Sequence, residues 1–295
     1  MNGPLALGQA PERTVVPIAS ALPRSCVSPI QAVQHIRRMR GGAQAHLMRA
    51  MDGCYYVVKF MNNPQHVRVL ANEFFATRLA QKLGIPVPEP AVIEVSSWLI
   101  EHTEDLRCGA GGQRLPFMSG LCFGSRFIAE PSALGTIVEY LPENCFNKVA
   151  NLNDFARVLV LDKWACNSDG RQCVFNRPPH SRGYRVTFID HGYCFNAGEW
   201  TFPDTPLRGV YANNAAYAGV TGWGSFEPAL SHAQKMSLAE IRQCTVGIPE
   251  EWYGHDADAL GRLIETLYLR RSIIRDLITR LRESSRNLFA NWNDR

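Results

Sequence analysis

The residues from Leu161 to Phe195 constrain the fold more than any other part of this chain. A polar loop, Asn167 to Gln172, follows an apolar helical pattern, and two short runs rich in apolar, β-branched and aromatic residues come after it, separated by a turn that contains proline and glycine. The second run is Arg185 to Ile189, so the sequence predicts a helix, a loop and a β-hairpin in this order. Asp169 stands in the loop and Asp190 directly follows the second strand. We therefore expect both carboxylates at the open end of one strand pair.

Two carboxylates in that arrangement are suited to phosphoryl transfer, in which one orients the acceptor hydroxyl and another holds magnesium. Each aspartate also has an ordinary structural interpretation, Asp169 as a turn residue and Asp190 as a cap at the end of a strand. These residues alone leave both interpretations open.

Three strand patterns earlier in the chain surround a turn of small residues. They cover Gln31 to Arg38, His46 to Ala50 and Tyr55 to Phe60. Between the first two lie Gly41, Gly42 and Ala43, and an Asp-Gly pair favours a tight hairpin before the third. Small residues at the first turn would let backbone N–H groups approach an anion, although the tip of a plain hairpin has the same composition.

Two charged residues interrupt apolar patterns in this region. Lys59 stands in the third strand among apolar neighbours, and Glu73 stands on or beside the apolar face of a helical pattern over residues 64–83. A buried glutamate needs a cationic partner, and the helix directly follows the strand, so Lys59 is a candidate for that partner. The alternatives are an edge lysine whose ammonium extends to water and a solvated glutamate.

The remaining patterns divide a β-rich first part from a helical second part. Strands are expected at residues 91–95, 98–101, 122–128 and 136–142, and helices at 151–166, about 227–236, about 237–245 and 256–285, the last of them continuous or broken. Residues 104–120 and 196–226 are predicted to be loops, and residues 1–28, which contain several prolines and no apolar period, a loose arm.

Composition argues against several functional classes. The net charge of +4 over 295 residues is too small to favour nucleic acid or an anionic membrane, and no apolar run reaches the roughly 18 residues of a membrane span. The N-terminus lacks the pattern of a signal peptide. The 9 cysteines are scattered without a CxxC pair, so we expect reduced thiols and a cytoplasmic protein, without a zinc site.

The order of these segments resembles the protein-kinase-like superfamily, and specifically the HipA-like kinase domains. YVVKF, NEFFATRLAQKLGIPVPEP and NSDGRQ are the most specific segments, followed by Asp190-His191-Gly192, and the resemblance extends over roughly residues 30 to 285. It implies an α+β, bilobal protein-kinase-like fold. After the arm at residues 1–28, a β-rich N-lobe would span 29–142 and a mainly helical C-lobe 143–295.

The resemblance also implies that ATP and Mg²⁺ are the cofactors, and it gives the N-lobe residues their roles. Gly41, Gly42 and Ala43 would cover the phosphates, and Lys59, positioned by Glu73, would contact the α- and β-phosphates. The backbone between the lobes would hold adenine, at Glu139, Tyr140 and Leu141.

The predicted C-lobe supplies the reacting groups under the same resemblance. Asp169 would be the catalytic base, Arg171 would neutralise charge on the γ-phosphate, and Asp190 would ligate Mg²⁺. The histidine or tyrosine usual before the base is absent, since Asn167-Ser168 stands there.

The second metal ligand departs from the kinase pattern. The asparagine expected five residues after the base is Val174, but Gln172 directly precedes the apolar strand, as that asparagine does in kinases. The loop therefore looks two residues shorter, and Gln172 is the first candidate, because an amide carbonyl can ligate Mg²⁺. Asn176 is the second candidate. His191 follows the metal aspartate in place of phenylalanine, which puts the switch role of that phenylalanine in doubt.

The predicted function is an ATP- and Mg²⁺-dependent phosphotransferase that acts on serine or threonine hydroxyls of a protein substrate. One alternative is a pseudokinase or nucleotide-binding module, which the altered metal ligand motivates. Another is a lipid or small-molecule kinase, although no polybasic run supports membrane docking. A small antitoxin-like partner would be expected of a HipA-type toxin, but the chain lacks room for the long N-terminal subdomain of full HipA proteins.

Overall fold

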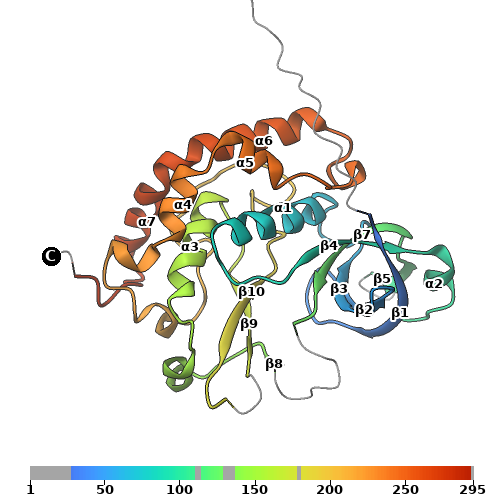
Figure 1. Ribbon diagram of the computed structural model, residues 1–295, viewed down its shortest axis with the longest axis horizontal. Helices are drawn as coiled ribbons and strands as arrows, with labels where there is room; N and C mark the ends of the chain where they lie inside the picture. Colours follow the sequence, from blue (N-terminus) through green and yellow to red (C-terminus); the bar gives the residue numbers. More distant parts are fainter. Residues whose placement is uncertain (1–27, 110–113, 129–136, 178–180, 294–295) are drawn as a thin grey trace, which may run out of the picture.

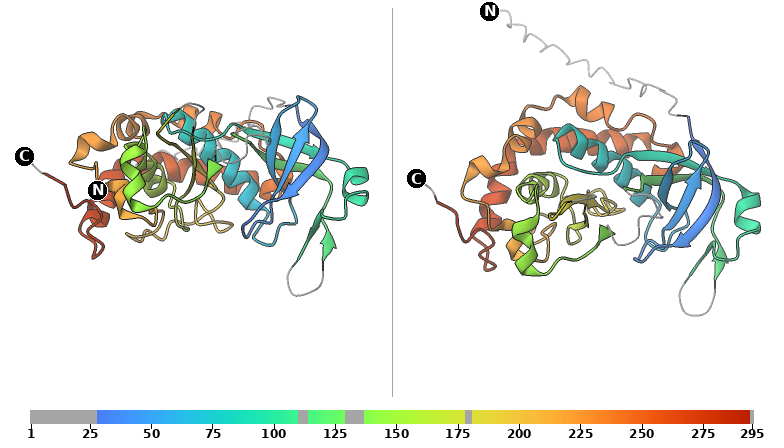
Figure 2. Two further views of the ribbon diagram at one scale, coloured as in Figure 1. Left: turned by 90° about the horizontal axis from the view of Figure 1, so that it is seen from below. Right: turned by 60° about the horizontal axis from the view of Figure 1, so that its bottom comes forward.

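The computed structural model describes residues 28–109, 114–128, 137–177 and 181–293. The predicted arm lies outside these residues except for Ser28, and so does Thr136, the expected start of a strand. A β-barrel forms one end of the molecule and a group of helices the other, and α1 (Arg68–Lys82) runs between them (Figures 1 and 2).

The barrel consists of five strands that close on one another. Their order around the barrel is β1 (Ile30–Arg38), β2 (His46–Ala50), β3 (Tyr55–Lys59), β7 (Gly120–Arg126) and β4 (Pro90–Val95). All neighbours are antiparallel except β1 and β4, which pair in parallel. Successive side chains of a strand point to opposite faces, so Tyr56 and Val58 of β3 fill the barrel core while Val57 and Lys59 lie on its outer face.

The barrel core contains a histidine, His46, with one hydrogen bond to its ring in the described part of the chain. His46 is 0% exposed, and its Nδ1 lies 2.9 Å from His35 Nε2, while in the described part of the chain its own Nε2 has no hydrogen-bond partner. The rings of Phe60 and Phe117 stand edge-on to it. Burial, together with the nearby His35 and Arg38, lowers the pKa of His46 to about 4.

This shift makes the barrel sensitive to acid. Between pH 6.5 and about 4 the unfolded chain binds a proton at His46 that the folded chain does not, so the free energy of unfolding falls as the pH drops through that window. We expect His46→Leu to reduce the loss between pH 6.5 and 4.5 by about 1–3 kcal/mol. Urea unfolding across this range measures it, with exposed His232→Leu as the control. If the free energy of unfolding fell equally with pH in wild type and His46→Leu, the lowered pKa of His46 would not be the cause.

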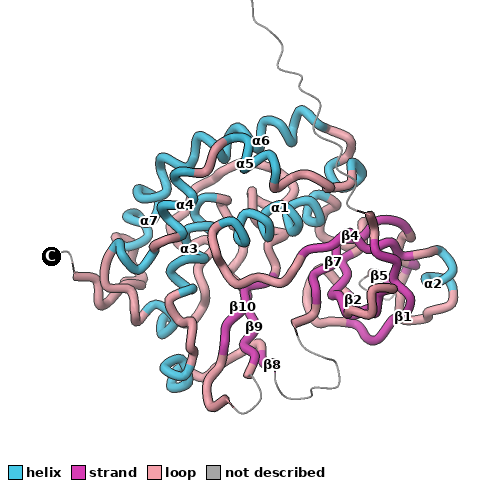
Figure 3. The backbone as a smooth tube through the Cα atoms, viewed as in Figure 1, coloured by secondary structure: helices cyan, strands magenta, loops and turns pink. Residues whose placement is uncertain are grey.

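A second, smaller sheet and a set of helices follow α1 in the chain. The sheet has the order β10 (Arg185–Ile189), β9 (Gln172–Asn176), β8 (Ile137–Val138), and Figure 3 shows it beside α3 and α1. The helices are α3 (Asp154–Trp164), α4 (Ala229–Lys235), α5 (Leu238–Gln243), α6 (Ala257–Arg270) and α7 (Ile274–Arg282), with 3₁₀ turns at Glu143–Lys148, Asn214–Tyr217, Trp223–Phe226, Glu250–Tyr253 and Arg271–Ile273.

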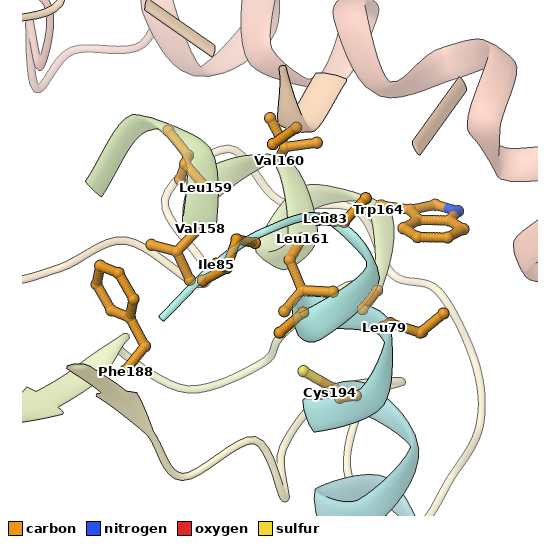
Figure 4. Close-up of a cluster of buried hydrophobic side chains, with 14 of the residues drawn as sticks. Leu79, Leu83, Ile85, Val158, Leu159, Val160, Leu161, Trp164, Phe188 and Cys194 are labelled. Carbon is orange, nitrogen blue, oxygen red and sulfur yellow. The ribbon is translucent and has the colours of Figure 1, made fainter. Parts of the chain in front are cut away.

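Helix α3 is the centre of the main hydrophobic core. All of its residues except Arg157 are buried, and Figure 4 shows Leu79 of α1, and Leu83 directly after that helix, beside Leu161 of α3. The Trp164 indole is buried and its Nε1 donates a hydrogen bond of 2.8 Å to the Leu267 carbonyl of α6. The core therefore joins α1 to the C-terminal helices, and the polar loop begins where α3 ends.

The strand predicted at 98–101 is wrong, because these residues form part of a short helix, α2 (Ser97–Glu101). Ser96 caps it by accepting a hydrogen bond of 3.2 Å from the Leu99 N–H, and an apolar run of three residues, Trp98 to Ile100, does not distinguish helix from strand. The loop predicted at 104–120 contains the strand pair β5 (Arg107–Cys108) and β6 (Leu115–Pro116). The pattern over 256–285 forms two helices, α6 and α7, joined by a 3₁₀ turn.

The 8 cysteines in the described residues are free thiols, most of them buried. No helix in this part of the chain has both the length and the apolar character that crossing a membrane requires.

Candidate active site

A cleft of about 920 Å³ lies between the barrel and the sheet β8–β10. Most of the residues predicted from the sequence line it: Gly41, Gly42, Ala43, Lys59, Glu73, Glu139, Tyr140, Arg171, Gln172 and Asp190. The exceptions are Leu141, which packs into the main core, Asn176 and Asp169. A volume of this size is ample for a nucleotide.

A buried ion-pair network occupies one end of the cleft. The Lys59 ammonium donates hydrogen bonds to Glu73 Oε1 and, over 2.9 Å, to Asp190 Oδ1. The second oxygen of Glu73 accepts a hydrogen bond of 2.9 Å from the His191 N–H. The lysine of β3, the glutamate of α1 and the aspartate after β10 thus meet at one point, although more than a hundred residues separate the first from the last.

The network fixes the charges of its members. Burial alone would lower the pKa of Lys59, but the attraction of Asp190 and Glu73 raises it above its ordinary value. Burial alone would raise the pKa of Asp190, but Lys59 lowers it to about 2. Burial also raises the pKa of Glu73 despite the nearby ammonium. At neutral pH the cleft therefore contains a lysine cation and an ionised Asp190.

The backbone of Asp190 has an uncommon conformation. Its φ of 58° lies in the left-handed region, which aspartate tolerates better than most residues but which still costs free energy. Residues held in this region against such a cost are concentrated at functional sites. Here the conformation occurs at the residue that brings its carboxylate to Lys59.

Asp169 lies beside the cleft, exposed on the polar loop. Its Oδ1 accepts a hydrogen bond of 2.8 Å from the Gly170 N–H, and its Oδ2 accepts a long one of 3.4 Å from Gln172 Nε2. Its backbone is fixed on both sides, because its N–H donates to Asn167 Oδ1 and its carbonyl accepts from Gly209. The loop is therefore held in place while the carboxylate stays accessible.

The strand register places the two candidates for a second metal ligand at different distances from Asp190. Gln172 pairs with Ile189, the residue directly before Asp190, whereas Asn176 pairs with Arg185 at the other end of β9. Four residues of extended strand span about 13 Å. Asn176 therefore lies at the far end of the strand from Asp190, while Gln172 lies beside Asp190, and the register favours Gln172 as the second ligand.

Arg171 does not have the surroundings predicted for it. Its guanidinium is fully buried and bonded through Nε and Nη2 to the carboxylate of Asp162, with 3.0 Å between Nε and Oδ2. Its Nη1 donates to the Ile189 carbonyl over 3.0 Å. Burial alone would lower the pKa of Arg171, but Asp162 raises it. Because all three nitrogens are engaged, Arg171 ties the polar loop to α3 and β10, and these contacts favour a structural role over the predicted contact with the γ-phosphate.

Asp162 is the partner that the sequence-based prediction missed. It lies on α3 and is 1% exposed, and it also accepts a hydrogen bond of 2.9 Å from Asn167 Nδ2. The sequence contains a signal for this partner, because a carboxylate inside an apolar helical pattern needs a cationic or hydrogen-bonding partner, as Glu73 does. Asp162 therefore supports both ends of the loop that carries Asp169.

Apolar side chains from both sides form the walls of the cleft. Val57 comes from the barrel, and Val174 and Ile189 from the smaller sheet. Arg37 and Arg40 add cationic side chains on the barrel side, next to the small residues 41–43. This lining would suit a ligand with a flat aromatic base and an anionic group. The base would lie between the apolar walls, and the anionic group would point towards Arg37, Arg40 and Lys59.

The oxygen donors in the cleft suit magnesium, which needs few protein ligands, better than a metal ion that is held by protein side chains alone. Within the described ranges, no three or more His, Cys, Asp or Glu residues gather into a site that could hold a metal. Asp190 and Gln172 provide one carboxylate and one amide oxygen at the same strand ends. Mg²⁺ prefers oxygen donors and is commonly held by one or two carboxylates, waters and the phosphates of a substrate.

The family model described as "HipA-like kinase" matches residues 32–281. No curated protein matches the chain in sequence. Among solved structures, hydra Fam20 with sugar is similar, with 11% identity, a TM-score of 0.52 and 88% of each chain covered. The Golgi casein kinase has 15% identity and a TM-score of 0.51, with 88% of this chain and 74% of that chain covered.

A third similar structure is the complex of Shewanella oneidensis HipA, HipB and operator DNA. Its identity is 13% and its TM-score 0.44, with 91% of this chain and 69% of that chain covered. At these identities the first two structures show that the fold is kinase-like with mixed α and β structure, and the third, with its lower score, adds no argument.

Proposed function

Because the chain belongs to the HipA-like kinase family, we propose that it is an ATP- and Mg²⁺-dependent phosphotransferase. The observation that carries the proposal is the convergence of Lys59, Glu73 and Asp190 at the end of the cleft, with Asp169 beside it. The barrel would belong to the N-lobe, residues 29–142. The helical part would belong to the C-lobe, residues 143–295.

ATP would bind with its base between Val57 and Val174 and its phosphates towards Lys59. Glu139 and Tyr140 line the cleft where the base would enter, and residues 41–43 line it on the barrel side. Lys59 would contact the α- and β-phosphates through a charge that its two carboxylate partners stabilise. Leu141 contributes its side chain to the core rather than to the cleft.

Asp169 would act on the acceptor. As the acceptor oxygen forms its bond to the γ-phosphorus, its proton passes to the Asp169 carboxylate, and the bond from the γ-phosphorus to the oxygen of the β-phosphate breaks to leave ADP. Asp190 and the side-chain carbonyl of Gln172 would hold the magnesium, which neutralises charge on the phosphate oxygens when bound. Arg171 and Asp162 would keep the loop in position.

The acceptor is proposed to be a serine or threonine of a protein. Asp169 is exposed at the side of the cleft, so its carboxylate can be reached by a bulky acceptor as well as by a small one. A cytoplasmic location and a small antitoxin-like partner stay predictions, as does the alternative of a lipid or small-molecule acceptor. A pseudokinase is the second candidate, because glutamine stands where kinases have the second metal-binding asparagine.

We expect Asp169→Asn to lower kcat by about 10²–10⁴-fold while ATP still binds, because only the proton acceptor is removed. The measurement is ADP formation and autophosphorylation with and without Mg²⁺, together with calorimetric titration of ATP. Exposed Asp105→Asn serves as a control. Full activity of Asp169→Asn would exclude it as the base, and ATP binding without turnover in the wild type would favour the pseudokinase.

The Gln172→Ala variant tests the second metal ligand. We expect it to need about 10-fold more Mg²⁺ for half-maximal turnover, because one oxygen donor is lost. Gln172→Asn keeps a shorter amide and should lie between wild type and alanine, and Asn176→Ala is the matched control at the far end of the same strand. An unchanged Mg²⁺ dependence in Gln172→Ala would show that the residue does not hold the metal.

A further inference from the structure

Asn72 is a fully buried amide on α1, directly before Glu73. Its Nδ2 carries two hydrogens and lies within hydrogen-bond distance of three carbonyl oxygens, those of Gly192 at 2.9 Å, Cys194 at 3.1 Å and Ala197 at 2.7 Å, so the two N–H groups are shared among them. Its Oδ1 accepts a hydrogen bond of 2.8 Å from Trp200 Nε1. One side chain thus contacts four residues of the stretch 191–200, which follows Asp190 and is called here the post-Asp190 segment.

Other residues of α1 contact the same segment. Arg68, one turn before Asn72, donates a hydrogen bond of 3.0 Å to the Gly198 carbonyl, and its guanidinium lies 4.5 Å from the centre of the Trp200 ring. Glu73 accepts from the His191 N–H. The N-terminal part of α1, from Arg68 to Glu73, is therefore bonded to the post-Asp190 segment at several points.

The helix and the segment also approach closely at Gly192. A Cβ atom on this glycine would lie 2.4 Å from Val69 Cγ1 and 3.2 Å from Glu73 Oε1. A side chain at this position would push α1 away and lengthen the distance from Glu73 to His191. The absence of a side chain therefore permits the contact in which Asn72 reaches the Gly192 carbonyl.

The post-Asp190 segment has no regular structure of its own to hold it. It contains no helix or strand, and Phe195, Asn196, Ala197 and Trp200 all have positive φ values between 52° and 59°. Such backbone angles are unfavourable for residues other than glycine and persist only where the surroundings impose them. Buried carbonyls of such a segment still need donors, and the two N–H groups of the Asn72 amide are shared among three of them.

We propose that Asn72 is a positioning residue that fixes the post-Asp190 segment to α1 and thereby sets Asp190 against Lys59. The contacts form a closed ring: Lys59 to Glu73, Glu73 to His191, Asn72 to Gly192, and Asp190 back to Lys59. The catalytic consequence rests on the proposed function, but the structural one does not.

The test compares Asn72→Ala with a matched control, Asn151→Ala. Asn151 is a partly buried asparagine before α3 whose amide also makes three hydrogen bonds, to Asp154 and to both backbone groups of Val186, away from α1. Asn72→Ser, which keeps one hydroxyl donor, replaces the alanine variant where that variant does not fold. Hydrogen exchange of the nucleotide-free proteins and calorimetric titration of ATP with Mg²⁺ are measured on all of them.

Asn72→Ala should speed amide exchange specifically in residues 191–200 and weaken Mg²⁺-dependent ATP binding or turnover by roughly 10–100-fold. Asn151→Ala should lower Tm without either effect, and Asn72→Ser should lie between wild type and alanine. Equal exchange and equal ATP affinity in the two alanine variants would overturn the proposal. A wild type without ATP binding would instead overturn the proposed function, and faster exchange confined to 191–200 would then still support the role of Asn72 in holding the segment.

Discussion

Replacing Asp190 with asparagine is expected to lower phosphoryl transfer by about 10²–10³-fold or more while the protein stays folded. The amide has no charge to hold the magnesium that the phosphates require, and it cannot neutralise Lys59. In the wild type, attraction to Lys59 lowers the pKa of Asp190 from 3.8 to about 2, which is roughly 2 kcal/mol of stability for a mostly buried group.

The sign of that contribution gives the variant a second, independent readout. A lowered carboxyl pKa stabilises the fold above the unfolded pKa, and the stabilisation is lost as the pH falls from 3.8 to about 2. Asp190→Asn should therefore be less stable than wild type at pH 7 and should lose less stability between pH 4 and 2. Steady-state turnover and urea unfolding at both ends of this range measure the two effects.

The matched control is Asp154→Asn, which removes a buried carboxylate paired with Arg157 outside the cleft. It should reduce stability and leave turnover unchanged. If Asp190→Asn kept its turnover, or if both variants lost it equally, the assignment of Asp190 to the metal site would be wrong.

Lys59→Met is expected to have the second large effect, on stability as well as on ATP binding. It leaves Glu73 and Asp190 facing each other without a cation, and removing one partner of a buried ion pair costs about 3–5 kcal/mol. The loss should be smaller at low pH, because protonation of the two carboxylates then removes their repulsion. Equilibrium unfolding at pH 7 and pH 4.5 measures this.

A double variant separates the ion pair from the general loss of a side chain. Lys59→Met with Glu73→Gln should be more stable than Lys59→Met alone, because the glutamine keeps an acceptor for the His191 N–H and only the Asp190 carboxylate is then left without its cation. Both should bind ATP weakly. A double variant as unstable as the sum of the two single variants would show that the two residues do not interact.

Lys59 and Glu73 could be found from sequence because each places a charge where the apolar period requires burial, and a buried charge needs a partner. Gln172 could be found because it stands directly before an apolar strand, and the structure begins β9 at this residue. Strand geometry also favours Gln172 over Asn176, since an extended strand places residues four positions apart about 13 Å from each other.

The roles of Arg171 and Asn72 depend on contacts that a local pattern does not contain. Arg171 lies two residues after Asp169, and this position suggested a contact with the γ-phosphate. In the structure its guanidinium instead forms an ion pair with Asp162, on the helix before the loop. Asn72 acts on a segment some 120 residues later that has no periodic pattern. The closure of the barrel likewise depends on the pairing of β1 with β4, which no strand pattern specifies.

The central claim is that this cleft transfers the γ-phosphate of ATP, and a single-turnover experiment tests it most directly. Protein in excess over γ-labelled ATP is mixed with Mg²⁺, and the label is followed in protein, in inorganic phosphate and in remaining ATP. We expect the label to leave ATP in the wild type and this loss to require Mg²⁺. Asp169→Asn should bind the same ATP, but the labelled phosphate should stay on it. Label that stays on ATP over hours in the wild type, with the nucleotide bound, would contradict the account and identify the protein as a nucleotide-binding pseudokinase.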